Sequence, residues 1–181
     1  MDKNINAVLK FWFSECAPKD WFIKTKSFDK EVKDRFNKLT CYALKDGLSD
    51  WEQSLEGSLA LILLLDQFTR NIFRGQKGSF SGDNSALKVS LNCTKKYYLP
   101  ISPPKWTQFM LMPMMHSENL IIQNNSLPLF KTYTDANVYK YAVKHQQIIK
   151  KFGRFPHRNI ILKRVSTLKE VNFLKKTGSS F

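Results

Sequence analysis

Apolar residues recur at helical spacing along most of the chain, in segments separated by proline, glycine and polar residues. This periodicity predicts helices over residues 4–15, 28–45, 55–73, 83–98, 105–123 and 135–152, and a last helix that opens at Thr167. Thr167 and Glu170 have the spacing of a capping box, and Gly153 is placed to end the helix before it. The sequence therefore predicts an all-α bundle of about seven helices and contains no convincing strand.

Several helix ends depend on single residues. Ser27 is predicted to cap the second helix, and Asp83 the fourth, because short polar side chains accept hydrogen bonds from the first turn. Residues 99–104 are predicted to form a turn. Pro113 has no backbone N–H, so it should kink or break the helix that passes through it.

The helix over residues 55–73 changes character halfway. Its first half is apolar nearly all round, which is typical of a helix buried in the middle of a domain. Its second half carries the polar residues Asp66, Gln67, Arg70, Asn71 and Arg74. A charge at that depth must be paired or serve a ligand. An internal bridge between Asp66 and Arg70, four residues apart on one face, is the alternative to a ligand site.

Two further groups of polar residues could carry chemistry. His116 and Glu118 follow a methionine-rich stretch, but residues two apart do not share a helix face, so they are not a simple two-ligand metal motif. The alternative is that His116 is an ordinary core histidine.

The third group lies on the loop over residues 152–159, which Gly153 frees from the preceding helix. This group contains Arg154, His157, Arg158 and Asn159, with His145 two turns upstream. A loop that only caps helix ends is the alternative. We nevertheless predict that all three groups converge on one cavity, since separate buried charges would each be costly.

Composition limits the setting in which this site would work. A chain of 181 residues with 43% hydrophobic content predicts one folded domain over residues 1–181. The longest apolar run, residues 59–65, is far shorter than the roughly 20 residues of a membrane-spanning helix. No secretory signal is visible, so we expect a cytoplasmic protein without a membrane partner. Three cysteines without metal-ligand spacing indicate reduced thiols, and the sequence implies no metal and no cofactor.

The net charge of +14 would attract nucleic acid, anionic lipid or acidic metabolites. Lysine accounts for 23 of the 29 basic residues and is spread along most of the chain, so binding of nucleic acid is expected to be non-specific. Four of the six arginines instead fall in the two segments described above. Because the guanidinium fork holds phosphate or carboxylate through two hydrogen bonds, this placement favours a small anionic ligand.

Five motifs together resemble those of an uncharacterised bacterial family, known as domain of unknown function 924. They are Phe11-Trp12-Phe13, Trp21-Phe22, residues 63–75, His116-Ser117-Glu118 and residues 152–159, and the match runs from about residue 11 to residue 173. The resemblance implies an all-α fold similar to tetratricopeptide repeats and implies no activity. Thr69 stands where the family usually has proline, which should leave this helix less interrupted.

The leading functional hypothesis is a pocket for a small phosphate- or carboxylate-bearing ligand, and the protein could be an enzyme. Candidate clamps are Arg70, Arg74, Arg154 and Arg158, and candidate acid–base groups are His116, Glu118 and His157. No nucleophile elbow, phosphate-binding glycine loop or dinucleotide fingerprint names a reaction. The alternative is a non-catalytic helical scaffold that binds protein or nucleic acid through a lysine-rich surface.

Overall fold

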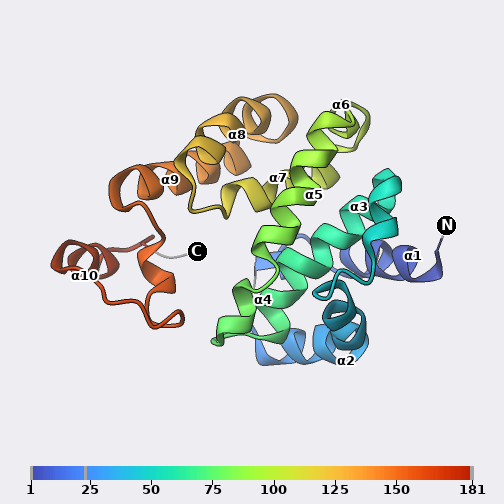
Figure 1. The fold of residues 1–181 in the computed structure, drawn as a ribbon, viewed down its shortest axis with the longest axis horizontal. Helices are drawn as coiled ribbons and strands as arrows, with labels where there is room; N and C mark the ends of the chain where they lie inside the picture. The colour runs from blue at the N-terminus through green and yellow to red at the C-terminus, as the bar shows by residue number, and fades with distance from the viewer. Residues whose placement is uncertain (1, 23, 180–181) are drawn as a thin grey trace. The chain divides into compact units, whose positions relative to one another are not determined.

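A computed structural model describes residues 2–22 and 24–179 (Figure 1). These residues form α-helices joined by short π-helical and 3₁₀ turns, and none of them lies in a β-strand, which confirms the predicted all-α class. The chain divides into two compact units, Met1–Pro113 and Met114–Phe181, which are called here the N-terminal and C-terminal units and are described separately. That both units form one domain stays a prediction.

Six helices belong to the N-terminal unit, and a seventh carries the chain across the boundary. They are α1 (Lys3–Lys10), α2 (Lys26–Ala43), α3 (Leu55–Ile62), α4 (Thr69–Ile72), α5 (Asp83–Lys95), α6 (Tyr98–Ile101) and α7 (Pro104–Met115). The C-terminal unit contains α8 (Leu120–Tyr133), α9 (Ala136–Phe152) and α10 (Leu168–Leu174). No helix within the described ranges is long and apolar enough to span a bilayer.

The core of the N-terminal unit is built on aromatic rings around Trp12, which is fully buried. The centroid of its ring lies 5.3 Å from that of Phe68 and 5.6 Å from that of Phe109. Its carbonyl oxygen accepts a hydrogen bond of 2.8 Å from Trp21 Nε1. Leu63 is also completely buried, which confirms that the apolar half of the predicted 55–73 helix is core.

The predicted 55–73 helix contains a wider turn at its centre. It consists of α3, a π-helical turn over Leu63–Phe68, and α4. The hydroxyl of Thr69 donates to the carbonyl oxygens of Leu65, at 2.8 Å, and Asp66, at 3.3 Å. The segment is thus helical without a break over residues 55–72, with a wider π-helical turn at its centre, and the comparison with relatives that carry proline at this position stays a prediction.

Two predicted helix caps are wrong. The side chain of Thr25, not Ser27, accepts the hydrogen bond from the Phe28 N–H and caps α2. Asp83 is the first residue of α5, and its carboxylate instead pairs with Arg70.

The helix count also differs from the predicted seven. The short helix α6 occupies part of the predicted 99–104 turn, and α7 passes Pro113 and ends at Met115 instead of reaching Gln123. Helix α8 then begins at a new cap, where Asn119 Oδ1 accepts from the Ile121 N–H at 2.8 Å. It continues through Pro128, a residue that reads as a helix breaker in the sequence.

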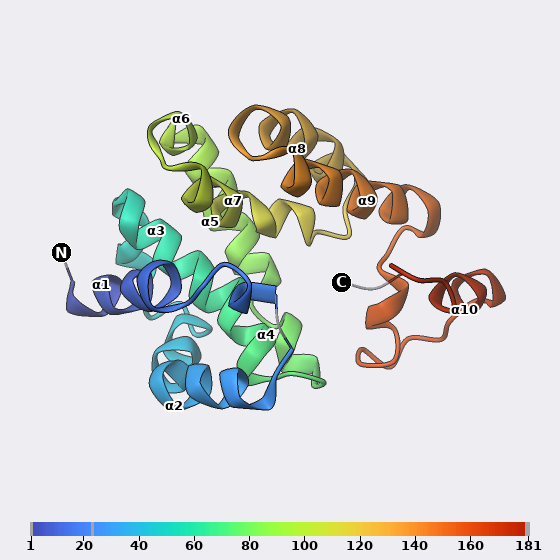
Figure 2. The ribbon, with the colours of Figure 1, turned by 180° about the vertical axis from the view of Figure 1, so that it is seen from behind.

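Helices α8 and α9 lie side by side in both views (Figures 1 and 2) and contact each other extensively. Gly153 adopts the left-handed conformation, with φ of 69°, and ends α9 as predicted. Ile148 and Ile149 of α9 pack with Phe155 into a small core. The predicted capping box of Thr167 is present at the start of α10.

Candidate functional site

The first polar group lies in the N-terminal unit and is held by ion pairs. Asp66 is completely buried, and its Oδ1 lies 3.2 Å from Arg70 Nη2. The same guanidinium lies 2.9 Å from Asp83 Oδ1 and donates to the carbonyl of Ser79. The internal Asp66–Arg70 bridge that the sequence offered as the alternative is therefore present, and the Arg70–Asp83 pair joins α4 to the start of α5.

Asn71 and Arg74 share a partner on α2. Asp29 Oδ1 accepts from Asn71 Nδ2 at 2.9 Å and from Arg74 Nη2 at 2.6 Å, and Arg74 Nε bonds the other oxygen. This two-bond contact ties the end of the polar segment to α2. Both arginines of the first group thus connect secondary-structure elements.

The second and third groups come together in the C-terminal unit. Glu118 accepts hydrogen bonds from the Phe155 N–H at 2.7 Å and from Arg164 at 2.6 and 2.9 Å. Burial alone would raise the pKa of Glu118, but the Arg164 guanidinium and the Phe155 N–H outweigh it and hold that pKa below its ordinary value. Glu118 is therefore an ionised carboxylate engaged with the 152–159 loop.

A second ion pair holds the far side of this loop. Arg154 donates to both carboxylate oxygens of Glu170, at 2.7 and 2.8 Å, and to the carbonyl of Val165 at 2.8 Å. The pairing with Arg154 lowers the pKa of Glu170 to about 2. Asn159 Oδ1 accepts from Arg164 Nε at 2.9 Å, and the Asn159 side chain also bonds Glu170, so this predicted site residue links the two pairs.

All three histidines gather around the ring of Phe155 or beside one another. The ring of His116 lies 6.1 Å from that of His145, and Phe155 lies 5.5 Å from His145 and 5.6 Å from His157. The Arg158 guanidinium lies over the same phenyl ring, 4.7 Å from its centroid, and donates to the carbonyl of His116 at 3.0 Å. We call these four polar residues and Phe155 the histidine cluster.

Within the histidine cluster, the protonation state of His145 can be deduced. Burial, followed by the nearby charge of His116, lowers the pKa of His145 to about 3, so the imidazole is neutral at pH 7. Its Nδ1 lies 2.7 Å from the Tyr141 carbonyl, which can only accept, so Nδ1 carries the proton. The lone pair is consequently on Nε2.

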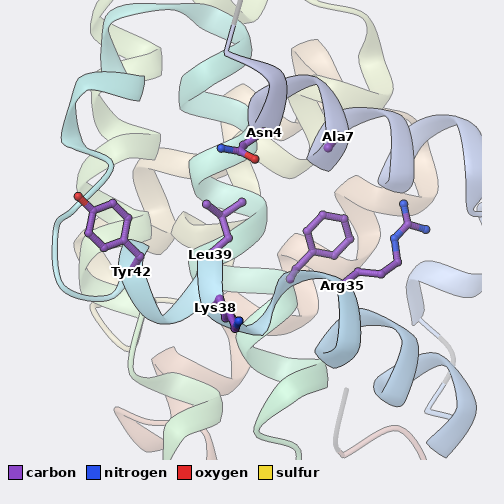
Figure 3. Close-up of a pocket in the computed structure, with 7 residues that line it drawn as sticks. Asn4, Ala7, Arg35, Lys38, Leu39 and Tyr42 are labelled. Atoms are coloured by element: carbon purple, nitrogen blue, oxygen red, sulfur yellow. The ribbon is translucent and has the colours of Figure 1, made fainter.

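Two surface hollows of the N-terminal unit are lined by none of the predicted site residues. The larger, of about 400 Å³, lies between α1 and α2, where Asn4 and Ala7 face Arg35, Leu39 and Tyr42 (Figure 3). The smaller, of about 260 Å³, lies among Asp46, Glu52 and Lys88 with apolar neighbours. Among residues 2–22 and 24–179, no three His, Cys, Asp or Glu side chains are arranged to hold a metal ion.

The structure thus joins two of the three predicted groups, since His116, Glu118, His145 and the 152–159 residues lie within the C-terminal unit. Convergence of the first group with them stays a prediction. Sequence reasoning missed Arg164, which bonds both Glu118 and Asn159. The argument used for the other arginines, a guanidinium in a chain that otherwise uses lysine, would also have selected it.

Comparison with known proteins assigns this chain to a family. The model of the family described as "Bacterial protein of unknown function (DUF924)" matches residues 8–178. A solved structure of a protein of unknown function from Agrobacterium tumefaciens is 32% identical in sequence to this chain and superposes on it with a TM-score of 0.89. The alignment covers 94% of this chain and 96% of the Agrobacterium chain. No match is found among curated proteins. The chain therefore belongs to the DUF924 family of bacterial proteins, as its motifs had suggested.

Proposed function

We propose that the C-terminal unit binds a small phosphate- or carboxylate-bearing molecule at the histidine cluster. The observation that carries this proposal is that His145, His157 and the Arg158 guanidinium lie against the ring of Phe155, with the ring of His116 beside that of His145. Imidazole and guanidinium N–H groups suit phosphate and carboxylate oxygens. Imidazole is the side chain that enzymes use most often as a general acid or base, and His116 and His157 are the candidates for that role here.

Among the predicted clamps, Arg158 is the one that we favour, because it lies within the cluster. Arg70, Arg74 and Arg154 each form an ion pair that connects parts of the fold outside the cluster. His116 and His157 are the proposed acid–base groups, and the Nε2 lone pair of His145 makes it an acceptor. Glu118, bonded to the loop backbone, is proposed to position that loop rather than to transfer protons.

A thermal-shift screen with inorganic phosphate and with phosphate- and carboxylate-bearing metabolites tests this proposal. A ligand at 100 times its Kd stabilises the folded state by about 2.7 kcal/mol. His116→Asn and Arg158→Gln should each reduce that stabilisation. Arg35→Gln, which removes an arginine paired to Glu15 in the N-terminal unit, is the matched control. A library without any hit, or hits that both variants bind as wild type does, would contradict the proposal.

The alternative function is a helical scaffold, packed like tetratricopeptide repeats, that binds nucleic acid or protein through lysines. The observation in its favour is that all nine lysines of the C-terminal unit are exposed, while Glu118 and Glu170 are engaged by arginines. Either function is proposed for the cytoplasm. Binding of any DNA or RNA that fades steeply with salt would support the scaffold. Tight, sequence-selective binding of nucleic acid at high salt would instead favour nucleic acid over the small anion as the functional ligand.

A further inference from the structure

Positive charge is concentrated in the C-terminal unit. Residues 114–181 contain 12 Lys and Arg and 3 Asp and Glu, so they carry 12 minus 3, or +9, of the total +14. Two of the three acidic residues, Glu118 and Glu170, are paired to arginines. The third, Asp135, caps α9. The charge that this unit presents to solvent is therefore overwhelmingly that of its lysines.

Three large aliphatic side chains are more than three-quarters exposed within one short segment of this unit. Ile160 is 86% exposed, Val165 is 89% exposed and Leu168 is 76% exposed. Lys163 and Lys169 lie in or directly after the same nine residues and are exposed as well. Single exposed aliphatic residues are ordinary, but three so close in sequence, interleaved with lysine, indicate an interaction surface.

Part of the backbone of this 160–168 segment is held by hydrogen bonds within the protein. The Arg164 N–H donates to the Asn159 carbonyl at 2.8 Å, and the Leu162 N–H donates to the Arg158 carbonyl at 2.9 Å. The Val165 carbonyl accepts from the Arg154 guanidinium at 2.8 Å. These backbone groups can therefore leave water without losing their partners, which is the condition for entering an apolar interface.

We infer that the 160–168 segment binds the surface of an anionic lipid bilayer, with Ile160, Val165 and Leu168 entering the acyl boundary and lysines facing lipid phosphates. Aliphatic groups gain by leaving water for hydrocarbon, and lysines add attraction to an anionic leaflet. A nucleic-acid backbone offers the lysines phosphate but offers the aliphatic side chains no hydrocarbon. A second copy of this surface would bring like charges together. The sequence expectation of no membrane partner rested on the lack of a spanning segment, which surface binding does not need.

Co-sedimentation of the full chain with lipid vesicles tests this inference. Wild type should bind vesicles of phosphatidylcholine and phosphatidylglycerol, bind phosphatidylcholine alone at least about tenfold more weakly, and dissociate as salt rises. The double variant Ile160→Ser, Val165→Ser should lose at least about tenfold in affinity for the anionic vesicles, which corresponds to about 1.4 kcal/mol.

Two controls separate this segment from general charge and apolarity. Ile121→Ser removes another exposed isoleucine, on α8, and should leave vesicle binding unchanged. Lys163→Gln with Lys169→Gln should weaken binding more than Lys77→Gln, which removes an exposed lysine of the N-terminal unit. The inference would be overturned if wild type bound both vesicle types equally or bound neither. It would also be overturned if the serine variant kept the wild-type affinity for anionic vesicles. Duplex DNA that binds wild type and the serine variant with equal affinity, while neither protein binds the anionic vesicles, would also overturn it. That result would assign the lysines to nucleic acid.

Discussion

His145 illustrates how a single buried side chain makes stability depend on pH. Its imidazole is neutral in the folded protein because burial, with the nearby His116, lowers its pKa from 6.5 to about 3. In the unfolded chain the same group takes up a proton as pH falls through 6.5. Between these two values the unfolded state binds more protons, so the free energy of unfolding decreases as pH falls.

Replacing His145 should therefore make the free energy of unfolding depend less on pH below pH 7. In wild type, His145 should account for a loss of about 2 kcal/mol in unfolding free energy between pH 7 and pH 5. His145→Gln should show a correspondingly smaller difference, measured by urea unfolding at the two pH values. The variant can be less stable overall, since only the difference between pH values is compared. An unchanged difference would mean that His145 is already protonated in the folded state.

Gly82 shows a second constraint at the level of one residue. A Cβ atom placed on Gly82 would lie 2.2 Å from the backbone carbonyl oxygen of Leu65, which cannot move without disturbing the π-helical turn. Gly82→Ala should cost roughly 1–3 kcal/mol of unfolding free energy. Gly75→Ala meets no atom within 4 Å but places alanine at φ of 75°, so it should cost only about 1 kcal/mol. If Gly82→Ala unfolds at the wild-type midpoint in urea, the Leu65 carbonyl yields to a Cβ atom at no cost, contrary to this prediction.

At the scale of the element, periodicity and caps predicted most of the fold. The helix ending at Gly153 and the capping box of Thr167 follow from local chemistry that the sequence displays directly. Helix α8 was not predicted as a separate helix, because its first residues were assigned to the helix over residues 105–123, and the structure also keeps Pro128 within it. Asp83 was misassigned because its partner, Arg70, is distant in sequence, so local rules could not weigh an ion pair against a cap.

The cap of α2 offers a direct comparison of two neighbouring hydroxyls. Thr25→Ala removes the side chain that accepts from the Phe28 N–H, so it should lower unfolding free energy by about 0.5–2 kcal/mol. Ser27→Ala, in the first turn, should change it by less than about 0.5 kcal/mol. Urea denaturation of both variants measures the difference. The reverse order would restore the cap that the sequence alone suggested.

The buried half of the 55–73 segment makes a stronger prediction. Leu63 has no exposed surface, so Leu63→Ala leaves a cavity and should cost roughly 2–5 kcal/mol. Leu39→Ala, at a partly exposed position of α2, should cost less. A loss well below 1 kcal/mol at Leu63 in equilibrium unfolding would show that this region repacks freely.

For the whole molecule, residue types indicated which positions are special, but not which of them would pair. Arginine in a lysine-rich chain correctly selected positions held in precise contacts, because the guanidinium fork bonds two oxygens at once. Whether that fork meets a ligand or a protein carboxylate depends on distant partners such as Asp29 and Glu170. Those partners are fixed by tertiary packing, which periodicity does not specify.

The pair of Arg164 and Glu118 should therefore matter more for stability than an exposed pair. Arg164→Gln leaves a half-buried carboxylate with one partner fewer, and we expect a loss of roughly 1–3 kcal/mol. Lys30→Gln breaks the exposed pair with Asp34 and should change unfolding free energy by less than about 1 kcal/mol. Thermal unfolding of the two variants under one buffer condition compares them. Equal, small losses would show that solvent screens the Arg164 pair as well.

The aromatic cluster around Trp12 also determines which part of the protein fluorescence measures during unfolding. All four tryptophans belong to the N-terminal unit, so tryptophan fluorescence, excited selectively, follows the unfolding of that unit alone; they are Trp12, Trp21, Trp51 and Trp106. Far-ultraviolet circular dichroism follows the helices of both. Because α7 carries the chain from one unit into the other as a continuous helix, the two signals should share one midpoint in urea. Different midpoints for the two signals would mean that the two units unfold independently of each other.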